Sequence, residues 1–374
     1  MFDQPQAFHA LIVAWGALNA ALLAVLGRRF GMPIGAALLG MPIGAAVLGA
    51  LAFALGPYAM YVHGWVGTLG DLLWVTCALA IAIVVARNPT RSVVVAVSLL
   101  LTVAALLAKE AAVSIPALLA LGWWFSGRQH RWGFAAMASA IPVAIYLTLR
   151  IGVLLFSSER GGAYDWSVLH IPARWLQYQL FAPIPMLFET SLTFARGVTL
   201  QIAVSLSLWL ALLAALWRSD KRLPRLFLAG GVIALGPVLI LAQSWNHYAY
   251  AFAALTSMVV AAAWHRAPRW GRMVIVLFAA LHLWHGINVM RTMRHVGEVQ
   301  AVFSPALADA VHQSKQPVVH MVPAAGSETW IFQRLSNQIP SHQGVAIGGR
   351  VQLVGSDAAA DYRIEADGRL MRLR

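Results

Sequence analysis

The residues of this chain best suited to chemistry are ionisable side chains that interrupt long apolar runs. Lys109 and Glu110 stand together in the segment LTVAALLAKEAAVSIPALLAL. A charge at the centre of a membrane helix costs about 2.5–3.5 kcal/mol on insertion scales, so such residues mark functional sites by default. A lysine at the membrane surface suits the phosphate of a lipid carrier, and a neighbouring carboxylate could orient it or act on a sugar hydroxyl. The alternative is a short turn between two helices, from which both charges reach water.

Three further segments carry polar side chains between apolar runs, at 56–71, 157–196 and 243–252. Their side chains could bind the phosphate or the hydroxyls of a sugar substrate, and their rings could stack on it. The same composition also fits an aromatic belt at the membrane surface, which anchors helices without doing chemistry. The substrate-binding candidates are Lys109, His63, Arg160, Arg174, His247, Tyr248 and Tyr250, and the catalytic candidates are Glu110 and Asp71.

Membrane-spanning helices are the elements that would position these residues. Sixty per cent of the residues are hydrophobic, only 11% are charged, and the mean hydropathy is +0.71. Each crossing of a bilayer needs about 20 apolar residues, and a helix satisfies its own backbone hydrogen bonds in lipid. We therefore expect an all-α polytopic membrane bundle of about ten spans, at 8–27, 42–60, 71–86, 92–108, 111–124, 133–156, 197–217, 226–243, 250–265 and 273–290.

The basic residues of positions 1–290 are distributed unevenly among the loops. Most of them fall in every second loop, at Arg28, Arg29, Arg87, Arg91, Arg128, Arg131, Arg218, Lys221, Arg222, Arg225, Arg266, Arg269 and Arg272. The positive-inside rule makes these loops cytoplasmic, which places both chain ends outside the cytoplasm of a bacterial inner membrane. Because the bases are dispersed over five loops and form no stripe, the net charge of +13 predicts no nucleic-acid partner.

The last part of the chain changes character. We expect a transmembrane domain over 1–296 and a small soluble periplasmic tail, α/β or β-rich, over 297–374. Short strands are predicted in this tail at 317–322, 329–333, 350–354 and 361–365, with an Asp-Gly turn at 366–369. The single cysteine, Cys77, excludes an intrachain disulfide. No nucleotide-binding or zinc-protease motif is present, so no cofactor is expected, while the need for a divalent metal stays open.

The order of these motifs resembles the GT-C superfamily of polytopic glycosyltransferases, in the branch near the tetratricopeptide-linked O-mannosyltransferases. The similarity covers roughly residues 8–265, and each motif in it is short. The matching motifs are Phe8-His9, FALGPYAMYVHGWVGTLGD, Ala108-Lys109-Glu110, YLTLR at 146–150 and WNHYAY at 245–250. Members of this superfamily join a sugar from a polyprenyl-phosphate carrier to an acceptor on the outer face of the membrane.

The resemblance implies roles for individual residues. Lys109 and Glu110 match the family's Lys-Glu motif, Asp71 matches its loop acid, and its late aromatic motif corresponds to His247, Tyr248 and Tyr250. The donor would be a polyprenyl-phosphate sugar, and the acceptor a glycan, a lipid or a protein. The chain departs from the family where Asn246-His247 replaces a Glu-Arg pair, and where the first helix and first outer loop, which hold the family's catalytic acid, have no counterpart.

Several interpretations follow from that departure. The chain is a shortened form, a degenerate paralogue with little activity, or an enzyme that uses Glu110 or Asp71 in place of the usual acid. A different class of function is a non-catalytic protein for transport or assembly of lipid-linked glycans. Polar residues along a path at mid-span depth would favour transport, whereas the charges of this sequence cluster at the predicted outer ends of the spans.

Overall fold

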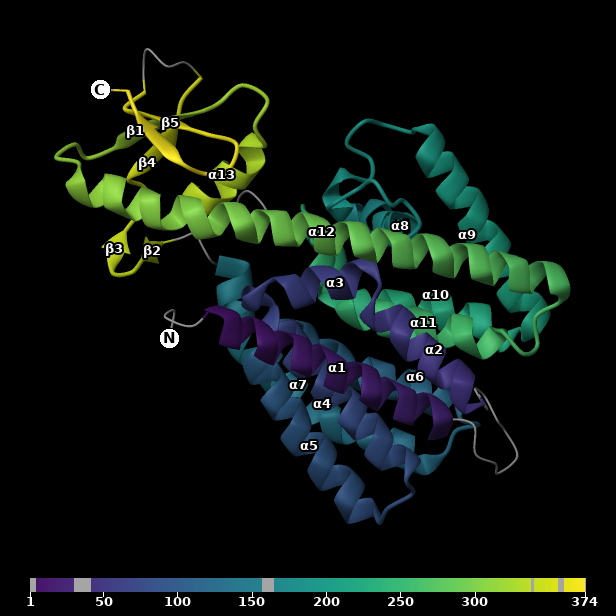
Figure 1. Ribbon diagram of the computed structural model, residues 1–374. Coiled ribbons are helices and arrows are strands. Elements are labelled where there is room, and N and C mark those ends of the chain that lie inside the picture. Colours follow the sequence, from purple (N-terminus) through teal and green to yellow (C-terminus); the bar gives the residue numbers. More distant parts are fainter. Residues whose placement is uncertain (1–4, 30–41, 157–164, 338–339, 356–359, 374) are drawn as a thin grey trace. The chain divides into compact units, whose positions relative to one another are not determined.

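Apolar helices form most of the structure, a computed structural model that describes residues 5–29, 42–156, 165–337, 340–355 and 360–373. The chain divides into two compact units, Gln6–Met290 and one that contains Arg291–Arg374 (Figure 1). The first unit is built from helices, and the second combines helices with a small sheet. The boundary expected near residue 296 lies within one long helix, α12 (Arg269–Gln313).

The helices of the first unit follow the predicted apolar runs. They are α1 (Pro5–Arg29), α2 (Ile43–Ala54), α3 (Pro57–Gly64), α4 (Leu69–Ala86), α5 (Arg91–Ala108), α6 (Ile115–Phe125), α7 (His130–Phe156), α8 (Ile171–Phe181), α9 (Leu200–Ser219), α10 (Arg222–Leu235), α11 (Tyr250–Ala263) and the start of α12. Short 3-10 helices join several of them: η1 (Val66–Thr68), η2 (Glu110–Ser114), η4 (Val168–His170), η5 (Thr190–Leu192), η6 (Gly236–Ile240) and η7 (Asn246–Ala249).

The length and composition of these helices fit a multi-pass membrane protein. Among the described residues, seven helices are long and apolar enough to cross a bilayer, and the pair α2–α3, bent by 55°, is a further broken span or re-entrant loop. Two of the ten expected spans are shorter than a crossing requires. The one at 111–124 is a short apolar helical stretch, Glu110–Phe125, and the one at 250–265 is α11, which has 14 residues.

The surface of the first unit carries large apolar side chains, which suit contact with lipid. Leu100, Leu107 and Leu149 on α5 and α7 are 70%, 85% and 78% exposed. Polar side chains lie between the same two helices, where Thr102 donates a hydrogen bond of 2.9 Å to Ser139. Exposed leucines on a soluble protein would be unfavourable, whereas lipid is as apolar as leucine, and interior hydroxyls then join the helices.

The bend between α2 and α3 is covered by α12. Pro57 removes a backbone donor at the bend, which ends α2. A Cβ atom added to Gly286 would lie 1.8 Å from the carbonyl oxygen of Leu55, and one added to Gly56 would lie 2.0 Å from Nε2 of His282. The two glycines therefore let the backbones approach so closely that no side chain fits between them.

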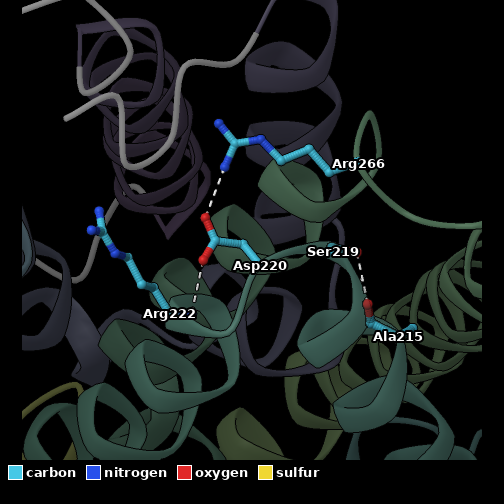
Figure 2. A network of polar contacts seen from close by, with 5 residues as sticks. All are labelled: Ala215, Ser219, Asp220, Arg222 and Arg266. Atoms are coloured by element: carbon cyan, nitrogen blue, oxygen red, sulfur yellow. Dashed lines mark hydrogen bonds and ion pairs between the residues drawn. The ribbon is translucent and has the colours of Figure 1, made fainter. Parts of the chain in front are cut away.

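A carboxylate joins two of the loops at the basic ends of the helices. Asp220, between α9 and α10, accepts a hydrogen bond from the backbone N–H of Arg222 at 2.9 Å. Its other oxygen lies 3.0 Å from Nη1 of Arg266, beyond the end of α11 (Figure 2). Just before it, the Ser219 hydroxyl donates to the carbonyl oxygen of Ala215 in the last turn of α9. One carboxylate thus organises two loops that sequence alone shows only as basic.

The second unit contains a four-stranded sheet of order β4-β1-β5-β6. Its strands are β4 (Val351–Leu353), β1 (Val319–Pro323), β5 (Tyr362–Ile364) and β6 (Leu370–Arg372); β1 is parallel to β4 and β5, and β5 pairs with β6 antiparallel. A separate hairpin pairs β2 (Ser341–His342) with β3 (Val345–Ala346). Phe303 and Leu307 of α12 belong to the apolar core of this unit.

The strand predicted at 329–333 is wrong. These residues begin the helix α13 (Thr329–Asn337). Ile331, Phe332, Leu335 and Ser336 are its buried residues, a spacing that places them on one face of a helix. Phe332 packs against Phe303, with ring centroids 5.2 Å apart. The helical period, rather than the strand propensity of Trp-Ile-Phe, decides this segment.

Candidate functional site

Asp71 and Lys109 form an ion pair at one end of the helical hairpin α4–α5. Asp71 lies in the first turn of α4, Lys109 follows the last residue of α5, and Lys109 Nζ is 3.3 Å from Asp71 Oδ2. The Asp71 side chain is 2% exposed and that of Lys109 18%. Gly70 permits this approach, because a Cβ there would lie 2.6 Å from the carbonyl oxygen of Ala108. A buried carboxylate therefore holds an ammonium group that still reaches the surface.

Glu110 lies outside this pair. It begins the 3-10 helix η2 and is exposed. Lys109 precedes it with an extended backbone, φ −158° and ψ 135°. The ammonium group of Lys109 is thus bonded to an acid 38 positions earlier, and adjacency in sequence does not decide its partner.

Aromatic side chains form a wall beside the ammonium group. Lys109 Nζ is 5.7 Å from the ring centroid of Tyr248, a distance at which a cation is attracted to a ring face. The Tyr248 ring contacts that of His247 at 4.3 Å between centroids. His247 in turn stacks on Tyr61 at 6.4 Å and meets the edge of Trp65 at 5.6 Å. The short helices η7 and α3 bring these rings together.

A carboxylate absent from the sequence-based candidates lies beside this wall. Glu189, in the connection between α8 and α9, has its Oε1 atom 3.5 Å from the Tyr61 hydroxyl. Its neighbour Thr190 is bonded to Asn246, which precedes His247. The sequence contains one indication of Glu189, an acidic residue in a long connection that includes prolines. Connections of this length are often functional.

The other candidates are positioned differently. Tyr250 is buried, receives a 3.4 Å hydrogen bond from Asn19 of α1 and packs on Phe53 at 4.9 Å. His63 approaches the same tyrosine ring edge-on at 6.1 Å. These contacts assign Tyr250 and His63 to the interior packing of α1, α2, α3 and α11. Arg160 lies outside the described residues.

Arg174 on α8 has its own set of partners. Its guanidinium donates to the carbonyl oxygen of Leu241 at 3.1 Å, to that of Ala242, and to Oε1 of Gln177 at 2.6 Å. Partial burial lowers the pKa of this group from its ordinary value, but an arginine in a protein stays charged. Arg174 therefore holds the chain between η6 and η7, and so supports the aromatic wall from a distance.

An apolar cavity of about 170 Å³ lies within the first unit. Trp74 and Val75, one turn beyond Asp71 in α4, line it together with Ile115, the first residue of α6. Ala251, next to Tyr250, lines it too. The remaining lining residues are nearly all apolar, so the cavity suits a hydrocarbon chain better than a polar ligand.

The described residues contain no group of three or more histidine, cysteine, aspartate or glutamate side chains arranged to hold a metal ion. Comparison of the chain with protein-family models, with curated proteins and with solved structures gave no match. Function must therefore be argued from the ion pair, the aromatic wall and the cavity.

Proposed function

We propose that the protein is a GT-C-like membrane glycosyltransferase that binds a polyprenyl-phosphate sugar with the phosphate at Lys109. The observation that carries the proposal is the position of the Lys109–Asp71 pair, next to an aromatic wall and one helical turn from residues of an apolar cavity. Such a donor combines an anion, a sugar and a hydrocarbon chain. The ammonium group suits the anion, and the apolar cavity suits the hydrocarbon chain.

The ion pair supports a phosphate site for a further reason. An ammonium group has three donors, and Asp71 occupies the buried side of this one. The partly exposed side can donate to phosphate oxygens without any rearrangement of the helices. Positive charge at the leaving phosphate would also stabilise the bond-breaking step.

Binding to undecaprenyl phosphate in lipid nanodiscs tests this proposal. The variant should carry both Lys109→Gln and Asp71→Asn, because removal of the lysine alone leaves a buried carboxylate without its cation. We expect affinity to fall by about tenfold or more, which corresponds to the loss of one charge-assisted contact. The matched control, Lys221→Gln with Asp220→Asn, removes the same charges from the α9–α10 loop and should bind as the wild type does.

Undecaprenol, which lacks the phosphate, provides the second arm of the experiment. Its binding should not differ between wild type and the Lys109 variant. Equal binding of undecaprenyl phosphate by both proteins would refute the phosphate site. Binding of lipid-linked sugars without release of the carrier would instead favour transport or assembly of lipid-linked glycans.

The same proposal includes a topology. The basic loops would be cytoplasmic, and the Lys109 end of the helices would face the outer side of a bacterial inner membrane, as would the C-terminal unit. This alternation requires that the short helices α6 and α11 also lead the chain from one face of the membrane to the other. Reporter fusions after residues 225 and 374 should then report opposite compartments. One compartment for both fusions would contradict the topology.

A further inference from the structure

The end of α5 opposite Lys109 carries an arginine that lies on the neighbouring helix. Arg91 is the first residue of α5 and Lys109 follows its last, so the 18 residues of the helix separate the two by about 27 Å. Figure 1 shows α7 beside α5, and the two helices contact each other. The guanidinium of Arg91 lies 4.1 Å from the centroid of the Phe134 ring, in the second turn of α7. The starts of α5 and α7 therefore adjoin.

The turn between α6 and α7 holds a second arginine beside the start of α7. Gly127 and Arg128 both have a left-handed backbone, with φ of 73° and 62°, a conformation that is usual for glycine and unfavourable for arginine. The guanidinium of Arg128 lies 5.7 Å from the ring centroid of Trp123. The Trp123 ring in turn lies 3.4 Å from the position of a Cβ atom on Gly133, in the first turn of α7. The turn thus directs Arg128 onto a ring that packs on α7.

Both guanidinium groups are held by rings and keep their donors free. Among the described residues, Arg91 and Arg128 make no hydrogen bond or ion pair, and both side chains are exposed. An arginine that stacks on a ring is restrained while its N–H groups still point to oxygen acceptors. Arg266 in the α11–α12 loop differs, because it is paired with Asp220 at 3.0 Å. Arg91 and Arg128 are therefore fixed, accessible cations.

The surroundings of the two arginines contain no acid to balance their charge. The first turns of α5 and α7 have no acidic residue, and neither connecting segment, 87–90 or 126–129, contains one. Arg131 adds a third cation, whose Nε and Nη2 atoms donate to Oε1 of Gln129 at 3.1 and 2.8 Å. Its Nη1 atom is buried without an acceptor among the described residues, which favours an anion next to it. The cluster is thus complementary to a negative charge.

A stripe of exposed apolar side chains extends from this cluster along α7. Met137, Ile141, Ile145 and Leu149 are 62%, 55%, 58% and 78% exposed. Their spacing of four residues places them on one side of the helix, and Met137 follows Phe134 by three residues, on the same side. Such a surface suits hydrocarbon chains. Cations that lack a counter-ion and a lipid-facing stripe therefore belong to the same helix.

We propose that the starts of α5 and α7 bind an anionic phospholipid, with Arg91 and Arg128 holding its headgroup and its acyl chains lying along α7. Guanidinium groups form strong, charge-assisted hydrogen bonds to phosphate oxygens. A net negative lipid is favoured over a zwitterionic one, since the described cluster offers no carboxylate to a cationic headgroup. This inference does not rest on the proposed function, because Lys109 lies at the other end of α5.

The test titrates the full chain, purified in detergent and freed of lipid, with dioleoyl phosphatidylglycerol or dioleoyl phosphatidylcholine, and measures bound lipid by native mass spectrometry. The wild type should prefer phosphatidylglycerol by about 25-fold, the attraction of two basic residues to anionic lipid. Arg91→Gln with Arg128→Gln should abolish this preference, whereas Arg91→Lys with Arg128→Lys keeps the charge and should retain most of it. The matched control, Arg222→Gln with Arg225→Gln, removes two exposed cations from the start of α10 and should bind as the wild type does.

Several results would overturn the lipid site. A wild type that binds both lipids alike would do so without any variant. An equal loss in the two glutamine pairs would reduce the preference to the general charge of the basic loops, and an unchanged preference after loss of Arg91 and Arg128 would exclude these two residues. Displacement of the bound lipid by inorganic phosphate would assign the cluster to a free anion. None of these results alters the expected binding of undecaprenyl phosphate at Lys109, which is tested by its own variants.

Discussion

Two ion pairs stand at opposite ends of α11 and differ in burial. At one end, Lys109 and Asp71 lie 3.3 Å apart with Asp71 almost fully enclosed; at the other, Arg266 and Asp220 lie 3.0 Å apart with side chains 40% and 25% exposed (Figure 2). The pair with the shorter N–O distance is thus the one more exposed to solvent. Distance alone would rank them wrongly, because solvent screens the exposed pair and not the buried one.

The difference in burial between the two pairs indicates which end of the helices is specialised. An exposed pair forms and breaks at little cost, so its presence in a loop needs no further cause. A buried pair must offset the removal of two charges from water, and it often contributes no net stability compared with apolar residues. The Lys109–Asp71 pair therefore suggests a use other than stability, in agreement with the proposed phosphate site.

The largest expected effect separates the two pairs directly. Lys109→Met leaves the buried Asp71 carboxylate without a cation, and we expect a loss of about 3–5 kcal/mol in the free energy of unfolding. Arg266→Met breaks the exposed pair and should cost about 0–1 kcal/mol. Unfolding of both variants in mixed micelles with increasing SDS measures the contrast. Equal losses would show that burial does not distinguish the two ends.

A smaller effect tests the close approach of α4 to the end of α5. Gly70→Ala places a methyl group 2.6 Å from the carbonyl oxygen of Ala108, and such overpacking costs about 1–3 kcal/mol. Gly44→Ala in α2 is the matched control, since a Cβ there meets no atom within 4 Å. That change should stabilise by about 0.5–1 kcal/mol, the helix preference of alanine over glycine. A neutral Gly70→Ala would mean that the hairpin end is loosely packed.

Part of the arrangement around Lys109 could be predicted from the sequence. Two apolar runs joined by the short segment 87–90 form a helical hairpin, which brings Asp71 and Lys109 to the same end. Which acid meets the lysine could not be predicted, because the answer depends on the packing of Gly70 against Ala108. The adjacent Glu110 was the simpler expectation, and it is exposed.

Other differences have related causes. The hydropathy of α11 predicted a span because the helix is apolar on all sides, but twelve of its 14 residues are buried in protein. A helix enclosed by other helices and a helix enclosed by lipid have the same composition. Glu189 was missed because the contact that holds its neighbour Thr190 comes from Asn246, 56 positions away, and no local pattern reveals a bond of that length.

The smallest predicted effect concerns the exposed pair and separates its two contributions. Asp220 uses one oxygen to accept the Arg222 N–H at the start of α10 and the other to pair with Arg266. Asp220→Asn keeps an acceptor for the N–H and removes only the charge, so it should cost less than about 0.5 kcal/mol and lose even that in high salt. Asp220→Ala removes both contacts and should cost about 1 kcal/mol, as loss of a helix cap does. If the asparagine variant were as unstable as the alanine variant, charge rather than capping would hold the two loops together. The basic end would then resemble the Lys109 end more closely than its exposure indicates.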